Sequence, residues 1–532
     1  MSGYLAIDFG TSNSIIAVWN DNDQQAHSLS IPEYSKIYQQ EGKEISVIPS
    51  LIHYSKTGEI WIGNQVLEKG LNCFPETFRW FKRYIQQRIP IKVNIAGSEV
   101  SPSIAGRDFL KSVLVNAIQH YELEYKEIAV SVPVESYEHY DYWLSSVIEE
   151  CGFSRYRLVD EPTAAAIGYG SHLNPGDTFA VFDFGGGTIH FSIILVEEQD
   201  PPSKNLRCRV IGKSGKDIGG STIDTWIFQK FLKENHLHDW DKETRLISNQ
   251  LLVECEKAKE KLSFTESAEI RINYPQLGDS NSYQITRSVL DELFDEHDLY
   301  TIINHLVRTA LNTAREYGFE EEDLRTVLMI GGSSHIPLIQ KAIRQIFGKE
   351  RVKSHRPYDA VAIGAAAFIA GKNFLDYIQH RYAIRYWNPQ KGLHGDYDYR
   401  TIIEKGTIYP SSQPISRLTI KASNPNQKKL GIAIFEMGSE NKMTTNTIEL
   451  VFDPQGCPRI MPVSPGDHEQ RSMFWMNENN LTFIEANPPA NPEENRFEVE
   501  FSIDHNKRLM ITVRDNQTGK LTHENFPVVQ LT

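Results

Sequence analysis

Residues 4–19 read YLAIDFGTSNSIIAVW, and residues 179–196 read FAVFDFGGGTIHFSIILV. In both stretches an apolar run ends at an aspartate, Asp8 or Asp183, before a turn of small residues and a second β-rich run. This pattern predicts two buried strands joined by a tight turn. Because the pattern occurs twice, we expect an internal duplication, with one acidic glycine hairpin in each of two lobes.

The segments around these hairpins alternate between strand and helix patterns. KEIAVSVPVES (126–136) is an apolar run that ends at Pro133 and precedes apolar residues at helical spacing. TVLMIGGSSHIPLIQKAIRQIF (326–347) has the pattern of a strand, a glycine turn and a helix. Such alternation is typical of α/β domains, and we expect one over residues 1–375.

The C-terminal part of the chain has a different pattern. Apolar residues occupy every second position, which predicts half-buried antiparallel strands, at Leu418, Ile420, Ala422, Leu430, Ile432, Ile434, Phe497, Val499, Phe501, Ile503, Leu509, Ile511 and Val513. We therefore expect a linker over 376–390 and an all-β, sandwich-like domain over 391–532. Pro- and Asn-rich stretches predict loops between about 436 and 495. The chain stops at Thr532 soon after the last strand pattern, so we expect no C-terminal helical subdomain.

Composition excludes several classes of protein. A net charge of -14 argues against nucleic acid as a partner, because nucleic-acid binders present basic surfaces. The five cysteines are scattered without a C-x-x-C pair, so neither a disulfide framework nor a zinc site is indicated. The start carries no basic leader, and no apolar stretch approaches the roughly 18 residues of a membrane span. We expect a cytoplasmic protein of about three or four compact units without a membrane partner.

The two glycine turns have the chemistry of a phosphate site. Glycine lets the backbone approach a phosphate chain closely, and successive N–H groups can point at it. The first turn consists of Gly10, Thr11, Ser12 and Asn13, and the second consists of Gly185, Gly186, Gly187 and Thr188. The carboxylates of Asp8 and Asp183 suit Mg²⁺ bound through water. A single such hairpin is usually a plain β-turn, but two copies in strand context favour a phosphate site.

Five segments together resemble the seventy-kilodalton heat-shock (DnaK-type) chaperone family. They are IDFGTSNS (7–14), VDEPTAAAIGYG (159–170), VFDFGGGT (181–188), EKAKEKLS (256–263) and VLMIGGSSHIPLIQ (327–340). The resemblance covers residues 4 to 370, and FEVEFSIDHNKRLMITVRDNQTGKL (497–521) resembles the last hairpin of the family's peptide-binding sandwich. It implies an α/β actin-like two-lobed ATPase domain followed by an all-β sandwich-like domain.

The resemblance also implies roles for individual residues. Lys82 would lie near the γ-phosphate, Glu161 would orient Mg²⁺-bound water, and Asp8, Asp183 and Thr188 would complete the catalytic set. Further contacts to the nucleotide would come from Gly219, Gly220, Glu256, Lys259, Ser263, Gly331, Gly332, Ser333 and His335. The implied cofactors are ATP or ADP and Mg²⁺, with K⁺ as an optional second ion. The implied partners are unfolded or extended polypeptide, a J-domain cochaperone and a nucleotide exchange factor.

At five places the sequence departs from the family pattern. His190 replaces an aspartate near the metal, and Glu260 and His335 replace the two arginines that sandwich adenine in many relatives. Asp141 replaces an arginine downstream of Pro133. The acidic, leucine-rich linker is replaced by FLDYIQHRYAIRYW (374–387). These changes place the usual coupling between nucleotide state and peptide affinity in question.

We therefore expect an ATP-binding, slowly hydrolysing, chaperone-like protein whose C-terminal β-domain binds extended polypeptide. The alternative is a nucleotide-sensing scaffold with little turnover that binds one specific protein partner. A small-molecule kinase is a third class, which would need a general-base aspartate at a sugar-sized pocket.

Overall fold

The computed structural model describes residues 2–40, 43–121, 124–133, 138–153, 155–170, 174–198, 206–238, 241–272, 282–370, 378, 380–388, 396–407, 409–411, 413–437, 448–452, 458–462, 473–478, 481–492, 494–504 and 507–531. The chain divides into two compact units. Unit 1 comprises Met1–Pro133, Val147–Phe374 and Ile448–Pro462, and unit 2 comprises Val134–Ser146, Leu375–Thr447 and Val463–Thr532.

Unit 1 contains two sheets with the same central plan. In each, an antiparallel hairpin lies beside strands that run parallel to its first strand. The first sheet has the order β12 (Tyr156–Asp160), β11 (Glu124–Val132), β1 (Ser2–Asp8), β2 (Asn13–Asn20), β5 (Lys43–Pro49), β4 (Lys36–Gln40), with β3 (Gln25–Ser28) on β2. The second has the order β15 (Leu206–Lys216), β14 (Ile189–Glu198), β13 (Thr178–Phe184), β18 (Leu324–Ile330), β19 (Val352–Lys353). The predicted duplication is therefore confirmed in strand order and direction.

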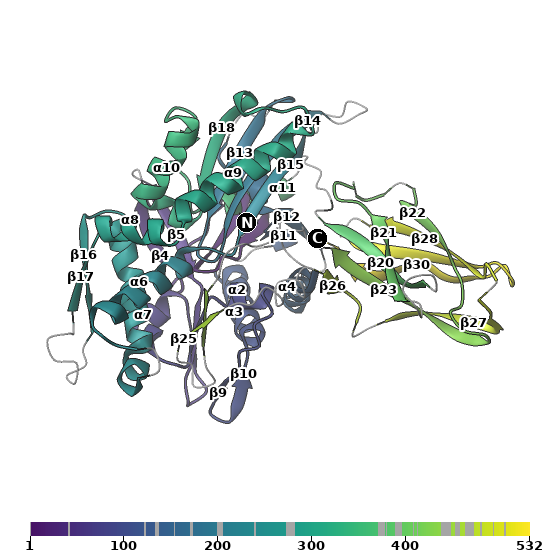
Figure 1. The fold of residues 1–532 in the computed structure, drawn as a ribbon, viewed down its shortest axis with the longest axis horizontal. Helices are drawn as coiled ribbons and strands as arrows, with labels where there is room; N and C mark the ends of the chain where they lie inside the picture. The colour runs from purple at the N-terminus through teal and green to yellow at the C-terminus, as the bar shows by residue number, and fades with distance from the viewer. Residues whose placement is uncertain are drawn as a thin grey trace. The chain divides into compact units, whose positions relative to one another are not determined.

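Helices and smaller sheets complete unit 1 (Figure 1). The helices are α1 (Asn64–Glu68), α2 (Phe81–Gln86), α3 (Pro102–Tyr121), α4 (Glu138–Glu150, shared with unit 2), α5 (Glu161–Gly168), α6 (Gly220–Glu234), α7 (Lys242–Leu262), α8 (Arg287–Glu296), α9 (Leu299–Arg315), α10 (Pro337–Phe347) and α11 (Ala360–Ile369), with short 3-10 turns η1 (Leu71–Cys73), η3 (Glu321–Asp323) and η4 (Gly332–His335). The smaller sheets are β6 (Leu51–Tyr54) with β7 (Ile60–Ile62) and β8 (Thr77–Arg79), β9 (Val93–Ile95) with β10 (Ser98–Val100), β16 (Ser267–Arg271) with β17 (Ser282–Thr286), and β24 (Ile448–Phe452) with β25 (Pro458–Pro462).

Helices α5 and α11 cross where the two halves of unit 1 meet. Both contribute to a single hydrophobic core that also contains strand residues of both large sheets, such as Ala6 and Val181. The crossing is so close that a methyl group on Gly364 would lie 1.7 Å from the Ala164 carbonyl oxygen. Any larger side chain there would force the helices apart, because a backbone carbonyl cannot rotate away. The core thus fixes the two hairpins relative to one another.

Unit 2 contains two antiparallel sheets whose inner faces share one core. The first has the order β21 (Asp396–Ile403), β20 (Arg381–Asn388), β23 (Gln427–Met437), β26 (Met473–Trp475), with β27 (Thr482–Ala490) also on β23. The second has the order β22 (Ser416–Ile420), β28 (Phe497–Ile503), β29 (Arg508–Asp515), β30 (Leu521–Gln530). The alternating residues of the sequence fill this core, as predicted: Val499, Phe501 and Ile511 are fully buried.

Two sequence expectations for this region need correction. Strand β20 lies inside the segment 376–390 that was expected to be a linker, and its Tyr382 and Ile384 belong to the sandwich core. Strand β27 includes Asn487, Pro488 and Pro489, part of a Pro- and Asn-rich stretch that was expected to form a loop. Strands β24 to β26 also lie between 436 and 495. A second Pro-rich stretch that was expected to form a loop, PVSPGD (462–467), lies almost entirely outside the described residues.

Within the described residues, no helix combines the length and the apolar character needed to cross a membrane.

Candidate functional site

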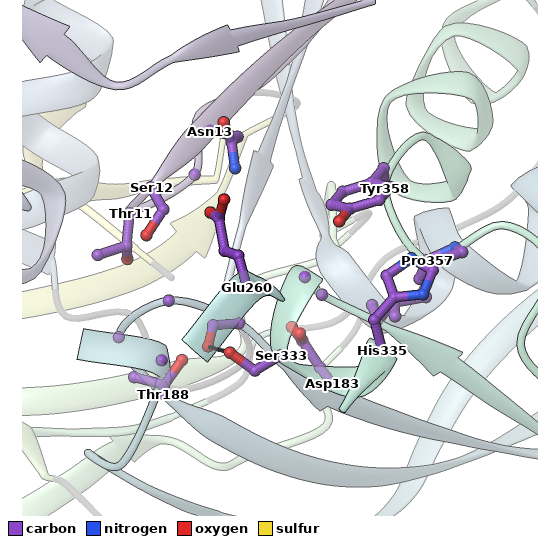
Figure 2. A pocket seen from close by; sticks show the side chains of 18 of the residues that line it. Thr11, Ser12, Asn13, Asp183, Thr188, Glu260, Ser333, His335, Pro357 and Tyr358 are labelled. Atoms are coloured by element: carbon purple, nitrogen blue, oxygen red, sulfur yellow. Dashed lines mark hydrogen bonds between the residues drawn. The ribbon is translucent and has the colours of Figure 1, made fainter. Parts of the chain in front are cut away.

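A cavity of about 1300 Å³, including its open mouth, lies in unit 1 between the two glycine turns. All of the residues expected to bind nucleotide line this cavity except Gly219, as do Tyr38, Glu260, Phe264 and Tyr358. Figure 2 shows Thr11, Ser12 and Asn13 on one wall and Thr188, Ser333 and Asp183 on the other. Gly219 lies behind the second turn, where a methyl group would approach the Gly186 carbonyl carbon to 2.5 Å.

The two turns lie in contact. A methyl group on Gly186 would lie 2.2 Å from the Ser12 Oγ, and one on Gly187 would lie 2.9 Å from the Thr11 Oγ1. Glycine is therefore needed at Gly186 and Gly187 for the hairpins to approach each other. Hairpins far apart would have contradicted the phosphate-site hypothesis, and the structure places them together.

Each turn is held in place by hydrogen bonds to one of its backbone carbonyl oxygens. In the first, the Ser50 hydroxyl donates to the Gly10 carbonyl oxygen at 2.8 Å. In the second, the Ser333 hydroxyl and the Gly220 amide donate to the Gly185 carbonyl oxygen at 2.9 Å and 3.0 Å. Such a fixed backbone is suited to receiving an anion without reorganisation.

Three acidic side chains, Asp8, Glu161 and Asp183, line one part of the cavity. Burial and the charge of Glu161 raise the pKa of Asp8 to about 6, although Lys82 and the Ser131 hydroxyl oppose this shift. Burial, Glu161 and Asp8 likewise raise the pKa of Asp183 well above its usual range. The Lys82 Nζ donates to the Glu161 Oε1 at 2.9 Å, with both side chains almost fully buried. One ammonium group is thus surrounded by three carboxyl groups, an arrangement that a further cation would relieve.

The donor set fits Mg²⁺, which prefers carboxylate oxygens and keeps several waters. Asp8 ends β1 and Asp183 lies near the end of β13, so the duplicated hairpins supply one carboxylate each. Glu161 begins α5, where the Asp160 side chain accepts a hydrogen bond from the Thr163 amide at 2.8 Å and caps the helix. Among the described residues, no group of three or more His, Cys, Asp or Glu forms a metal cage by itself.

Helix α7 supplies the polar wall at the other end of the cavity. Glu256, Lys259 and Ser263 line it, as the sequence predicted. Lys259 is nine-tenths buried, and its Nζ lies 2.8 Å from the Asp224 Oδ1 and donates to the Gly220 carbonyl oxygen at 3.0 Å. Lys259 therefore also ties α7 to α6.

The turn after β18 forms the third wall. Gly331 has a φ of 82°, and a methyl group on it would lie 2.4 Å from the Phe184 carbonyl oxygen. His335 lies beside Tyr358 with ring centroids 4.9 Å apart. Burial lowers the pKa of His335, which keeps the imidazole neutral and able to stack near neutral pH. Figure 2 shows both rings on the same side of the cavity, and the Glu260 side chain pointing into it.

Two of the residues that depart from the family pattern are not among the residues that line the cavity. His190 is paired with Asp183 across the β13–β14 hairpin. Asp141 is fully buried on α4.

Sequence reasoning missed several residues at this site, Ser131, Tyr38 and Tyr358 among them. Ser131 donates to the Asp8 Oδ1 at 2.6 Å, and Tyr38 and Tyr358 form part of the cavity wall. Ser131 follows the apolar run of β11, whose parallel pairing with β1 brings it to Asp8. The expected parallel pairing of these two strands could have predicted that Ser131 lies beside Asp8. No sequence motif indicated the two tyrosines.

Comparison with known proteins agrees with this geometry. The sequence model of the Hsp70 protein family matches residues 85–373, which is more than half of the chain. The chain belongs to the Hsp70 family. It is similar to the chaperone protein DnaK of Thermosipho melanesiensis, with 28% identity over 382 residues, and to the chaperone protein DnaK of Buchnera aphidicola subsp. Schizaphis graminum, with 27% identity over 400 residues. Each match covers 69% of this chain and 59% of the relative's length. Membership of the Hsp70 family implies an actin-like ATPase fold, which accounts for the duplicated sheets of unit 1.

Proposed function

We propose that this chain binds ATP and ADP with Mg²⁺ in the cavity of unit 1 and hydrolyses ATP slowly, with water as the nucleophile. The observation that supports this most strongly is the contact between the two glycine turns beside the paired Asp8 and Asp183 carboxylates. Backbone amides of the turns and the hydroxyls of Thr11 and Thr188 would bind the phosphate oxygens. When bound, Mg²⁺ would neutralise charge on the phosphates.

The protein's own groups would position the attacking water. Lys82 is held at the cavity by Glu161, so its ammonium group is fixed rather than free to sample solvent. Glu161 accepts a hydrogen bond from Lys82 and lies beside Asp183, and its carboxyl group would orient a water molecule there. Catalysis of phosphoryl transfer depends mainly on such positioning and on charge stabilisation.

Lys82→Ala tests this assignment. We expect phosphate release to fall by about 10²- to 10³-fold while ATP affinity changes little, because the ammonium would act mainly on the transferring phosphoryl group. Phosphate release under single turnover, with ATP affinity measured in parallel, would show the two effects separately. Lys56→Ala is the matched control, because its side chain is 79% exposed and distant from the cavity lining. Unchanged turnover in a folded Lys82→Ala variant would contradict the assignment.

We further propose that the β-sandwich of unit 2 binds extended polypeptide. Strand β21 is an edge of its sheet among the described strands, and edge strands can pair with an added peptide. The face of this sheet opposite the core is rich in aromatic side chains, with Trp387 42% and Tyr397 49% exposed. Exposed apolar groups of this size are characteristic of interaction surfaces. J-domain cochaperones and nucleotide exchange factors are further partners in this proposal.

One observation favours the second candidate, a scaffold with little turnover. His190 lies opposite Asp183 in the hairpin register, where the family pattern has an aspartate, so the metal end of the site has one carboxylate fewer. Binding of an unfolded peptide should be compared in ATP and in ADP. A difference in peptide affinity supports the chaperone, whereas equal affinities together with no phosphate release support the scaffold.

A further inference from the structure

An aromatic contact in the cavity wall joins the two halves of unit 1. Tyr38 lies on β4, an edge strand of the first sheet, where it is paired with Ile45 of β5. Tyr358 follows β19 of the second sheet. The two rings are stacked, with centroids 5.5 Å apart and an angle of 21° between their planes. Both residues line the cavity.

The surrounding side chains hold this contact in place. The His335 ring lies 4.9 Å from Tyr358 on the lobe that carries β18, and the Lys36 Nζ lies 4.6 Å from the centre of the Tyr38 ring. Tyr38 and Tyr358 also pack against the shared hydrophobic core. Burial, with the nearby charges of Glu260 and Glu256, raises the pKa of Tyr38 above its usual range, so its ring stays an uncharged stacking surface.

The position of this contact determines what it can control. Glu256, Ser263 and His335 line the same cavity, and these are the residues assigned to the nucleoside. At a centroid separation of 5.5 Å the rings are in direct contact, which leaves no space for a base between them. A nucleoside at this end would therefore lie beside the stacked rings. Separation of the two rings would widen the route by which the nucleoside leaves the cavity.

We propose that Tyr38 is a gate residue for the nucleoside and that its contact with Tyr358 sets the rate of nucleotide release. This proposal rests on the proposed nucleotide binding and adds to it a kinetic role for strand β4. The contact joins the two lobes at the cavity wall, so separation of the lobes at this point requires loss of the ring stacking. When the two rings are stacked, a bound nucleotide is released more slowly. The two glycine turns, and not the rings, bind its phosphates.

The test is the dissociation rate of ADP carrying a fluorescent label on the ribose, bound with Mg²⁺ and displaced by excess unlabelled ADP in a stopped-flow instrument. Tyr38→Ala should release the nucleotide about two- to tenfold faster, the range expected for loss of one aromatic pair. Tyr38→Phe keeps the ring and should release it at the wild-type rate. Ile37→Ala is the matched control, because Ile37 is the neighbouring residue on β4 and is 45% exposed.

A double-mutant cycle completes the test. If the two rings act through their mutual contact, Tyr38→Ala should have little further effect in a Tyr358→Ala background. An unchanged release rate in Tyr38→Ala, or full additivity in the double variant, would overturn the gate while leaving the proposed nucleotide site intact. Absence of labelled ADP binding to the wild-type chain would overturn both proposals.

Discussion

At the scale of single residues, the proposed site depends on two glycines, which have no side chain. Gly186 and Gly187 leave room for Ser12 and Thr11, and this contact brings two segments about 170 positions apart to one cavity. The sequence pattern predicted which residues form each turn. It could not predict that the turns touch, because contact depends on how α5 and α11 pack.

Gly186→Ala tests the contact between the turns. Its methyl group would overlap the Ser12 Oγ, so we expect nucleotide affinity to fall by at least about tenfold as the hairpins separate. Ser12→Gly removes the obstructing side chain, and the double variant should recover part of the affinity. Affinities of the two single variants and the double variant for ADP measure this recovery. Equal losses in Gly186→Ala with and without Ser12→Gly would contradict the proposed steric cause.

Other site residues were not predictable from sequence for identifiable reasons. Tyr38 lies in a strand whose neighbours carry no motif, and its role depends on a ring from the other lobe. Lys259 was correctly placed on the cavity wall, but its pairing with Asp224 requires α6 to lie beside α7. Contacts across elements were missed, whereas residues adjacent to a motif were found.

At the scale of elements, strands were predicted correctly where burial gives the apolar residues a regular pattern along the sequence. The hairpins of unit 1 are buried on both faces, and strands β28 and β29 are buried on one, so their sequences show strong patterns. Strand β27 was missed because it includes Asn487, Pro488 and Pro489, residues that usually indicate a loop. Among the described strands it pairs only with β23, and an edge strand tolerates proline because one side of its backbone needs no partner.

The β28–β29 pair depends on a buried ion pair that can be tested. The Arg496 Nη2 donates to the Asp515 Oδ2 at 2.9 Å, and both residues are almost fully buried. Asp515→Asn leaves the guanidinium without its counter-charge, so we expect the free energy of unfolding to fall by about 3 kcal/mol at neutral pH. Glu500→Gln, which removes a more exposed partner of Arg417 in the same sheet, should cost less than about 1 kcal/mol.

The effect of Asp515→Asn should depend on pH in one direction. Burial opposes the shift, but hydrogen bonds from Gln517 and Thr518 and the charge of Arg496 lower the pKa of Asp515. Because this pKa is lower in the folded than in the unfolded state, the stabilisation is complete above about pH 4 and is lost as pH falls through the folded value. Guanidinium unfolding at neutral pH and near pH 3 should therefore show a smaller difference between the proteins in acid. A difference that is constant with pH would argue against this ion pair.

At the scale of the whole molecule, the chain combines an Hsp70-family unit with a β-sandwich unit. The resemblance that identified the family also caused one error. Residues 376–390 were compared with an interdomain linker, although aromatic and β-branched residues such as Tyr382 and Ile384 are typical of a strand. Residue patterns within the segment were more informative about its structure than its position relative to the family.

The most direct test of the central claim is a calorimetric titration of the full chain with ADP and ATP, in Mg²⁺ and again in EDTA. We expect one site per chain for both nucleotides, with affinity that falls when the metal is removed, because Asp8 and Asp183 then face the phosphates without a cation between them. Failure of both nucleotides to bind at about millimolar concentration would contradict it.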